Sequence, residues 1–145
     1  MLNLDEAALE GRFCDTELSW TDSDGQKVVL SDEQRLVENQ PKENVDETQP
    51  WVRFTISPGD SQQETLEFVP AYTQLGMAYL QVFAPKGTGM SAAREIRDQF
   101  VTAYRGWKSD DEYTFVDGVG FRNVDQPAYA QINVSVSWQS MRRPS

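Results

Sequence analysis

Gly87–Ala92 is the segment of this sequence whose spacing comes nearest to a chemical motif. It reads Gly-Thr-Gly-Met-Ser-Ala and fits the pattern G-x-G-x-x-A, in which glycines let the main chain approach a pyrophosphate at the start of a helix. Asp110 and Asp111 follow about twenty residues later, where such sites place an acid for the ribose. However, residues 84–86 separate the preceding predicted strand from the first glycine, and the sequence holds one such unit only. We therefore interpret the segment as a strand-to-helix turn, with a small nucleotide-binding enzyme as the less favoured alternative.

Two acidic clusters have the residue types that bind cations. Asp22–Gly25 matches the centre of a calcium loop, but Trp20 and Ser31 stand where such a loop needs acids. The tip of a hairpin accounts for the same residues. Asp110–Glu112 follows a predicted helix, where an acidic turn is usually solvated. We predict no metal site and no cofactor.

The sequence contains no histidine and one cysteine, Cys14. Without histidine, the chain lacks the commonest general base, the commonest transition-metal ligand and the usual activator of a serine or cysteine nucleophile. Asp15 disfavours the thiolate of the neighbouring Cys14, and a single cysteine forms no internal disulfide. We predict no catalytic residue and no enzymatic activity.

The charge of the chain is unevenly distributed. The 145 residues carry 13 Lys and Arg against 23 Asp and Glu, a formal net charge of −10. Residues 1–50 hold 13 acids and 4 bases, a net of −9, so the remainder is nearly neutral. Proteins gain affinity for nucleic acids by neutralising phosphates, so this balance argues against specific nucleic-acid binding. No apolar run approaches the roughly 18 residues of a membrane span, and we expect a soluble intracellular protein.

The first third of the chain predicts a helix, a hairpin and a long connection. Apolar residues at helical spacing indicate a helix over residues 3–13, with Asp5 in its first turn, where an acid suits the helix dipole. Residues 18–21 and 26–30 flank Asp24-Gly25, which is a strong hairpin signal. Residues 31–49 are polar and acidic and predict a connection without regular structure.

After Pro50 the pattern is that of strands. Val52, Phe54 and Ile56 alternate with polar residues and predict a strand with one buried face. Trp51 is out of phase with them, and we expect it to be an exposed contact. We expect residues 57–60 to form a turn, residues 66–69 a short strand, and residues 75–84 a longer strand covered on both faces.

The last third predicts a helix and further strands. Apolar residues trace one stripe of a helix over residues 91–106, which ends at Gly106. Residues 113–116 and 119–124 predict two short strands around Asp117-Gly118. Residues 129–139 alternate strictly and predict a long strand with one dry and one wet face. Trp107 and Trp138 fall on apolar faces, and we expect both in the core.

The assembled fold class is α+β. We expect a mainly antiparallel β-sheet with one main amphipathic helix packed on one face, plus a short N-terminal helix. We expect a single domain over residues 1–145, in which 1–49 form the acidic helix, hairpin and loop, and 50–141 form the core sheet and helix.

Three segments in a characteristic order resemble the tail terminator proteins of long-tailed bacteriophages. They are the strand at residues 50–57, the run from Gly76 to Gly89 with its Pro-Lys-Gly-Thr-Gly ending, and the terminal strand at residues 131–138. The resemblance covers about residues 38–141 and does not extend to the acidic N-terminal part. It implies a structural protein of the virion, at the neck of the tail, that assembles in the host cytoplasm.

The resemblance also implies partners. Copies of the chain would form a ring, commonly a hexamer, that caps the head-proximal end of the tail tube, stops its polymerisation and joins the tail to the head connector. The implied partners are a second copy of the chain, the major tail tube protein and the head-tail connector protein, with no membrane. DNA would pass through the channel without specific binding, since six copies at −10 each carry −60. The main alternative is another head-to-tail connector or a tail completion protein.

A ring subunit contacts its neighbours through sheet edges, loops and polar faces. The candidate interface residues are Trp51, Asp60, Pro85, Lys86, Gly87, Thr88, Gly89, Gln131, Asn133, Ser135 and Ser137.

Overall fold

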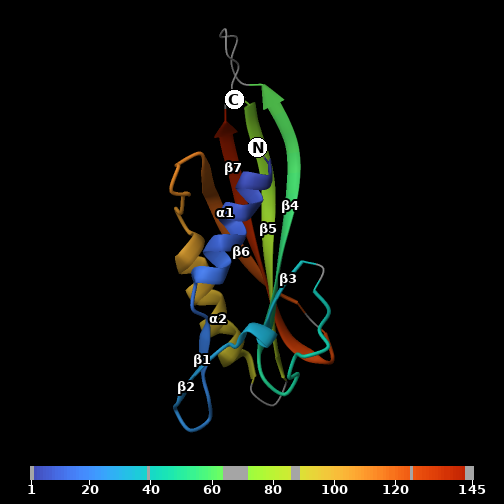
Figure 1. The fold of residues 1–145 in the computed structure, drawn as a ribbon. Coiled ribbons are helices and arrows are strands. Elements are labelled where there is room, and N and C mark those ends of the chain that lie inside the picture. The colour runs from blue at the N-terminus through green and yellow to red at the C-terminus, as the bar shows by residue number, and fades with distance from the viewer. Residues whose placement is uncertain (1, 39, 64–71, 86–88, 125, 143–145) are drawn as a thin grey trace.

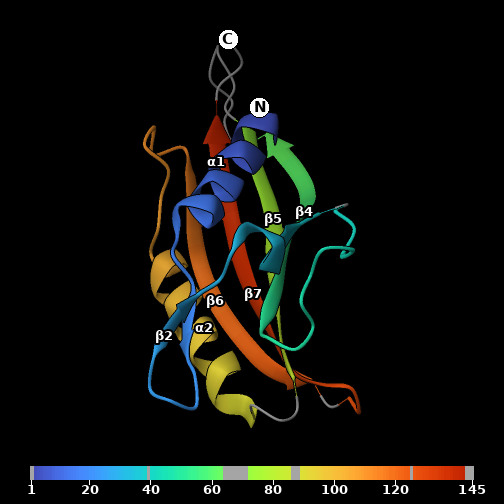
Figure 2. The ribbon, with the colours of Figure 1, turned by 60° about the horizontal axis from the view of Figure 1, so that its bottom comes forward.

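The computed structural model describes residues 2–38, 40–63, 72–85, 89–124 and 126–142. Its main element is a five-stranded sheet in the order β3-β4-β5-β7-β6, which is antiparallel except for the β3–β4 pair. The strands are β3 (Arg35–Val37), β4 (Trp51–Gln63), β5 (Tyr72–Pro85), β6 (Thr114–Val124) and β7 (Tyr129–Arg142). Two helices, α1 (Leu2–Asp15) and α2 (Gly89–Tyr104), lie on the same side of this sheet (Figures 1 and 2). The predicted α+β class is confirmed.

The core lies between the sheet and the helices. Residues at alternate positions of β4, β5 and β7 are buried on this side, and they pack against Ile96, Phe100 and Tyr104 of α2. The predicted dry face of the last strand is confirmed, with Trp138 1% exposed. Trp107, which we expected in the core, is half-buried and packs against it. Alternation of period two in the strands and a stripe in α2 therefore build one hydrophobic cluster in the part of the chain described.

The N-terminal helix is close to its predicted range, but its buried face differs from the expected one. Leu4 is 58% exposed, whereas Asp5 is fully buried and Leu9 and Phe13 reach the core. The Asp5 carboxylate accepts hydrogen bonds from the hydroxyls of Thr114 (2.8 Å) and Ser140 (2.7 Å). These two residues are cross-strand partners of β6 and β7. Asp5 therefore lies in the first turn of the helix, as predicted, but its carboxylate is buried against the sheet.

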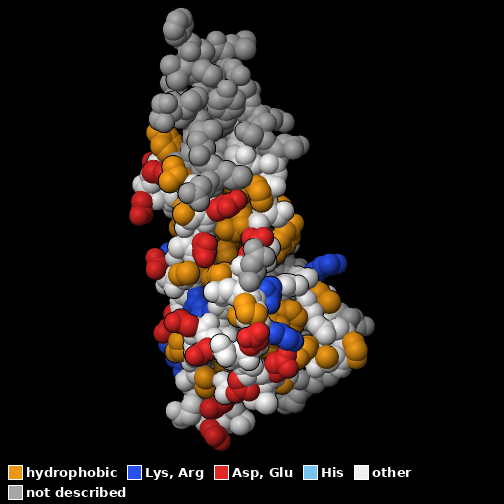
Figure 3. Space-filling view, turned by 45° about the vertical axis from the view of Figure 1, so that its right-hand side comes forward, with side chains coloured by type: hydrophobic (Ala, Val, Ile, Leu, Met, Phe, Trp, Pro, Cys, Tyr) orange, Lys and Arg blue, Asp and Glu red, His pale blue; other side chains and the backbone are white. Residues whose placement is uncertain are grey.

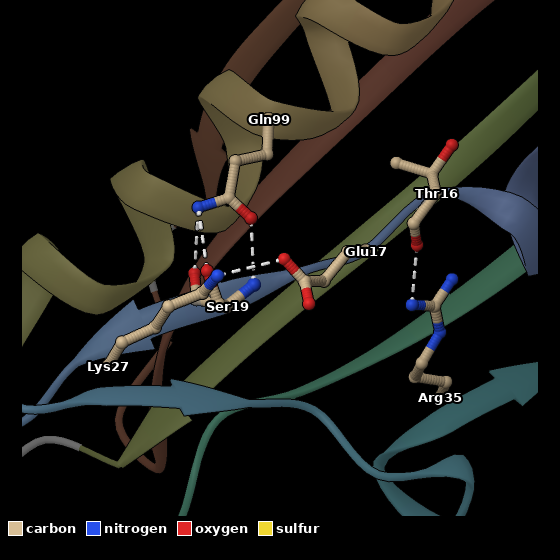
Figure 4. A network of polar contacts seen from close by, with 6 residues as sticks. All are labelled: Thr16, Glu17, Ser19, Lys27, Arg35 and Gln99. Carbon is tan, nitrogen blue, oxygen red and sulfur yellow. Dashed lines mark hydrogen bonds and ion pairs between the residues drawn. The ribbon is translucent and has the colours of Figure 1, made fainter.

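The hairpin predicted around Asp24-Gly25 is confirmed as β1 (Ser19–Thr21) and β2 (Lys27–Val29). The hairpin lies beside α2. There, the side-chain amide of Gln99 makes the two main-chain hydrogen bonds that a neighbouring strand would otherwise make with Ser19. The Ser19 amide donates to Gln99 Oε1 (2.7 Å), and Gln99 Nε2 donates to the Ser19 carbonyl (3.0 Å), as Figure 4 shows. The Thr21 amide donates to Glu95 Oε2 at 2.6 Å. The outer edge of β1 is therefore satisfied by side chains of the helix.

The segment 31–49 is more ordered than the sequence predicted. It contains a short 3₁₀ helix, η1 (Asp32–Gln34), and the strand β3, which extends the sheet parallel to β4. The Gln34 side chain is buried and bonds the main chain of Asp46 and Pro50. A strand of three residues is too short to produce a periodic signal, so the sequence predicted only a connection.

The turn predicted at residues 57–60 and the break predicted between two short strands at Asp117-Gly118 are instead irregularities within long strands. Residues 57–60 belong to β4, whose pairing with β5 shifts between Pro58 and Ser61. Asp117 belongs to β6, whose pairing with β7 shifts between Val116 and Gly118. Such bulges accommodate an extra residue without ending the strand, and they tolerate proline and glycine. The prediction of a turn at residues 57–60 and of two separate strands around Asp117-Gly118 was wrong for this reason.

The remaining predictions divide between those confirmed, those wrong and those outside the described residues. The stop of the main helix at Gly106 is confirmed, because this glycine has a φ of 71°. The prediction that both faces of β5 are covered was wrong, because Leu75 (42% exposed) and Tyr79 (37% exposed) lie on a face that is open. The strand predicted at residues 66–69 lies outside the described residues. Within the described part, no helix is long and apolar enough to cross a membrane.

Candidate functional site

The glycine-rich turn does not have the surroundings of a nucleotide site. Both neighbours of β5 in the sheet are antiparallel to it, whereas the dinucleotide motif belongs to adjacent parallel strands. Helix α2 begins at Gly89, and Pro85 ends β5. Lys86, Gly87 and Thr88 lie outside the described residues. The sheet topology favours the strand-to-helix turn.

The acidic clusters are used by their own turns. Asp22 Oδ1 accepts hydrogen bonds from the amides of Asp24 and Gln26, both at 2.9 Å, and Gly25 has a φ of 79°. Asp111 Oδ1 accepts from the Ser109 hydroxyl (2.5 Å) and the Tyr113 amide (3.0 Å). In the described part of the chain, no group of three His, Cys, Asp or Glu has a geometry for a metal. These carboxylates stabilise turns.

The open face of the sheet, on the side away from the helices, is the best candidate for contacts with other proteins. It consists of Trp51, Arg53, Thr55, Met77, Tyr79, Gln81, Phe83, Gln131, Asn133, Ser135 and Ser137. This set contains one charged residue and no acid, although the chain carries −10. Asp117 and Arg122 lie at its β6 margin. A surface without acids on an acidic protein lets copies approach with little mutual repulsion.

The predicted polar residues of the last strand do lie together on this open face. Gln131 is buried and pairs through its amide with Gln126 and, at 2.9 Å, with Asn133. Asn133, Ser135 and Ser137 are half-buried, so this face is less wet than the alternation predicted. Their role in an interface stays a prediction.

Tyr79 and Met77 complete the central part of the open face, and the sequence analysis missed them. They are the cross-strand partners of Ser135 and Ser137. Their alternation within β5 is a signal that could have found them, but the apolar content of that strand suggested burial on both faces.

Trp51, like Gln131, is a buried candidate, and it is only 4% exposed. Its ring stacks on Phe83 at 4.1 Å and meets Tyr129 edge-on at 6.1 Å. Lys42 lies over the same ring, 5.3 Å from its centroid. The predicted exposure of Trp51 was therefore wrong, since the loop before β4 and the ends of β5 and β7 cover it.

The residues that cover Trp51 are linked by an ion pair between Lys42 and Glu47 and by a hydrogen bond from the Tyr129 hydroxyl to Glu47. Lys42 Nζ lies 2.5 Å from Glu47 Oε1. Hydrogen bonds from Lys42 and Tyr129 lower the pKa of Glu47, and the same bonds raise the pKa of Lys42 and of Tyr129. Lys42 and Glu47 are exposed and Tyr129 is half-buried, so we assign the cluster a local role in covering the aromatic rings.

Asp60 lies at the bulge of β4, and its side chain lies outside the described part of the structure. The main chain is closely packed there, because a Cβ at Gly59 would lie 2.8 Å from the Leu75 carbonyl oxygen. Gln74 Nε2 donates to the Gly59 carbonyl at 2.6 Å. The bulge is therefore fixed from both strands.

In the described part of the chain, the larger surface hollows beside β3 lie one on each face of the sheet. The hollow on the open-face side has a volume of about 280 Å³ and is lined by Asp32, Glu33, Leu36, Gln40, Pro41 and Asn44. The hollow on the helix side has about 430 Å³ and is lined by residues of α1, the following loop and β3, among them Phe13, Cys14, Arg35 and Val37. Neither hollow has a signal in the sequence, because both depend on the unpredicted strand β3.

Comparisons with known proteins identify relatives of this chain. The family model described as phage tail terminator protein matches residues 6–138. A solved structure whose title states no function covers 100% of this chain and 99% of its own length, with a TM-score of 0.63 and 13% sequence identity. At this identity the likeness shows the fold alone. The search of curated proteins found no match.

Proposed function

Since the chain belongs to the phage tail terminator family, we propose that it forms a ring on the head-proximal end of the tail tube. Membership of this family supports a structural role in the phage tail and a place in the virion. In the proposed role the ring stops polymerisation of the tube and presents a surface to the head connector. The match over residues 6–138 is the observation that carries the proposal, because it includes the acidic N-terminal part as well as the sheet.

The geometry of the described residues supports contacts between proteins more than chemistry. The carboxylates considered as cation ligands are engaged in turns, while a broad sheet face without acids is open to partners. Because antiparallel sheets are stable with one face in solvent, this face needs no cover within the chain. We propose that it contacts either the tube or the next subunit.

The surplus of acids has a use in this role. We propose that part of it faces the channel of a hexamer and repels DNA, so that DNA passes without adhering to the wall. The outcome that would refute this is a ring in which the acids of residues 1–50 face outwards and arginines line the channel.

Native mass spectrometry of the purified protein tests the ring. We expect a closed oligomer near six times 16.5 kDa without an adduct. The same spectrum taken with short tail tubes distinguishes the tail terminator from a connector, because only a terminator binds the tube in the absence of heads. A single chain that carries a nucleotide-sized adduct would overturn the proposal and restore the glycine turn as a site.

A further inference from the structure

The two edges of the five-stranded sheet differ in charge. Strands β3 and β6 are its outermost strands. Exposed acids surround β3, namely Asp32, Glu33, Glu38 and Glu43, and none of the four forms an ion pair with a described lysine or arginine. Figure 3, in which the β3 side comes forward, shows acidic side chains dispersed over this side, with lysine or arginine side chains among them. At the β6 edge, Arg122 is exposed, and Arg97 of α2 lies over Phe121 while it pairs with Asp98. Opposite charges at opposite edges are what a head-to-tail contact between identical subunits requires.

The β6 edge presents an apolar and a basic side chain next to each other. In the described residues, no strand pairs with the outer side of Gly118–Val124, and most of this segment is exposed. Phe121 is 51% exposed and lies under the Arg97 guanidinium, 4.3 Å from its ring centroid. An unpaired edge with an exposed aromatic residue is a surface that proteins normally protect or use for assembly.

Phe121 and Arg122 point to opposite faces of the sheet. Phe121 pairs with Val134 and lies on the helix side, whereas Arg122 pairs with Asn133 and lies on the open-face side. The two hollows beside β3 lie on the same two faces. The helix-side hollow offers Phe13 and Val37, and the open-face hollow offers Asp32 and Glu33. Phe121 therefore lies on the same face as a hollow lined by Phe13 and Val37 together with the charged Glu10 and Arg35, and Arg122 lies on the same face as a hollow that contains two acids.

The strand directions agree with such a contact. Strand β3 is parallel to β4, and three antiparallel steps lead from β4 through β5 and β7 to β6. Strand β6 thus runs opposite to β3, and the sheet of the next copy would continue in antiparallel sense. The Gln40 side chain and amide already bond the main chain of Val37, so side chains rather than a continuous ladder would carry the contact.

We propose that the β6 edge of one copy docks on the β3 edge of the next copy, with Phe121 in the helix-side hollow and Arg122 against Asp32 and Glu33. The contact is heterologous and repeats around the ring. This inference rests on the proposed function, since it specifies how the ring is held together.

A charge exchange tests the acidic half of the contact. We expect Arg122→Glu and Glu33→Arg each to raise the concentration at which the oligomer dissociates by about tenfold or more, because each places like charges face to face. The double variant Arg122→Glu/Glu33→Arg restores opposite charges across every contact and should recover the wild-type value. Arg105→Glu, which makes the same charge change at an exposed site on another surface, is the matched control.

A disulfide between position 121 of one copy and the native Cys14 of the next copy tests the proposed position of Phe121. Cys14 lines the helix-side hollow and is the one cysteine of the sequence. In Phe121→Cys under mild oxidation, we expect a ladder of linked subunits on a non-reducing gel. The ladder should be absent from Phe121→Cys/Cys14→Ser and from Leu75→Cys, whose cysteine would be exposed elsewhere.

The outcomes separate the two proposals. A wild-type ring that neither charge reversal weakens, or Phe121→Cys chains that stay unlinked under mild oxidation, overturns this contact and leaves the ring in place. A wild-type chain that stays single with and without tube ends overturns the proposed function, and the contact with it.

Discussion

The carboxylate of Asp5 accepts a 2.7 Å hydrogen bond from the hydroxyl of Ser140, which joins two residues 135 positions apart. The same carboxylate binds Thr114, so α1 is tied to the last two strands of the sheet through one buried acid. The first turn of α1 and the end of β7 consequently lie at the same end of the molecule (Figure 1). These bonds fix the first turn of α1 against the ends of β6 and β7.

Replacement of Asp5 by alanine is predicted to destabilise the protein strongly. Thr114 and Ser140 are buried and would lose the acceptor that satisfies them. We expect the free energy of unfolding to fall by about 3 kcal/mol, at the upper end for hydrogen bonds to a charged group. Urea denaturation measures the change. Glu10→Ala, at an exposed position of the same helix, should change it by less than about 0.5 kcal/mol.

Replacement of Gly76 by alanine is predicted to disturb the core. Gly76 is the cross-strand partner of Trp138, and a Cβ there would lie 2.4 Å from Trp138 Cζ2. The indole is fully buried and has no room to move, so overpacking should cost about 3 kcal/mol. Thermal unfolding is the measurement. The control Gly120→Ala meets nothing within 4 Å, and an equal loss in both variants would contradict the predicted clash with Trp138.

Tyr104 is predicted to make the protein sensitive to alkali. Its hydroxyl donates to the Leu9 carbonyl at 2.6 Å, and burial raises its pKa well above the ordinary value. The unfolded phenol ionises near pH 10 while the folded one stays protonated, so stability should decline as the pH rises above about 10.

The variant Tyr104→Phe checks this prediction. It should lose about 1 kcal/mol at neutral pH through the missing hydrogen bond, and its stability should decline less steeply above pH 10. Tyr113→Phe, at an exposed position, is the comparison. Identical slopes in the wild type and Tyr104→Phe would argue against the assignment.

The hairpin β1–β2 is predicted to depend on Gln99. In Gln99→Ala, the Ser19 amide and carbonyl lose their partners on α2. We expect amide hydrogen exchange at Ser19 and Thr21 to accelerate about tenfold, with little change in global stability, because local opening becomes easier. Thr102→Ala, which is exposed on the same helix, should leave the exchange unchanged.

The helices and the alternating strands could be predicted from the sequence. Val134, Val136 and Trp138 indicate a half-buried strand, because strict alternation of apolar and polar residues places each kind on its own face of a sheet. The elements that were missed depend on pairing at a distance. Strand β3 exists only because β4 lies beside it, and the bulges at Asp60 and Asp117 look like turns until the partner strands are known.

The candidate site was predictable in part. The polar residues of the last strand were placed on one face, as the structure has them, whereas the burial of Trp51 depends on Lys42 and Phe83 from other parts of the chain. The two edges that we propose to meet in the ring could not be found from the sequence, because edge position is a property of the whole sheet.

Electron microscopy of tail tubes polymerised in the presence of this protein tests the proposed termination of the tube most directly. We predict shortened tubes that carry one ring of this chain at a single end, with no further growth from that end. Tubes that grow to the same length with bare ends, or that carry the protein along their walls, would contradict this role.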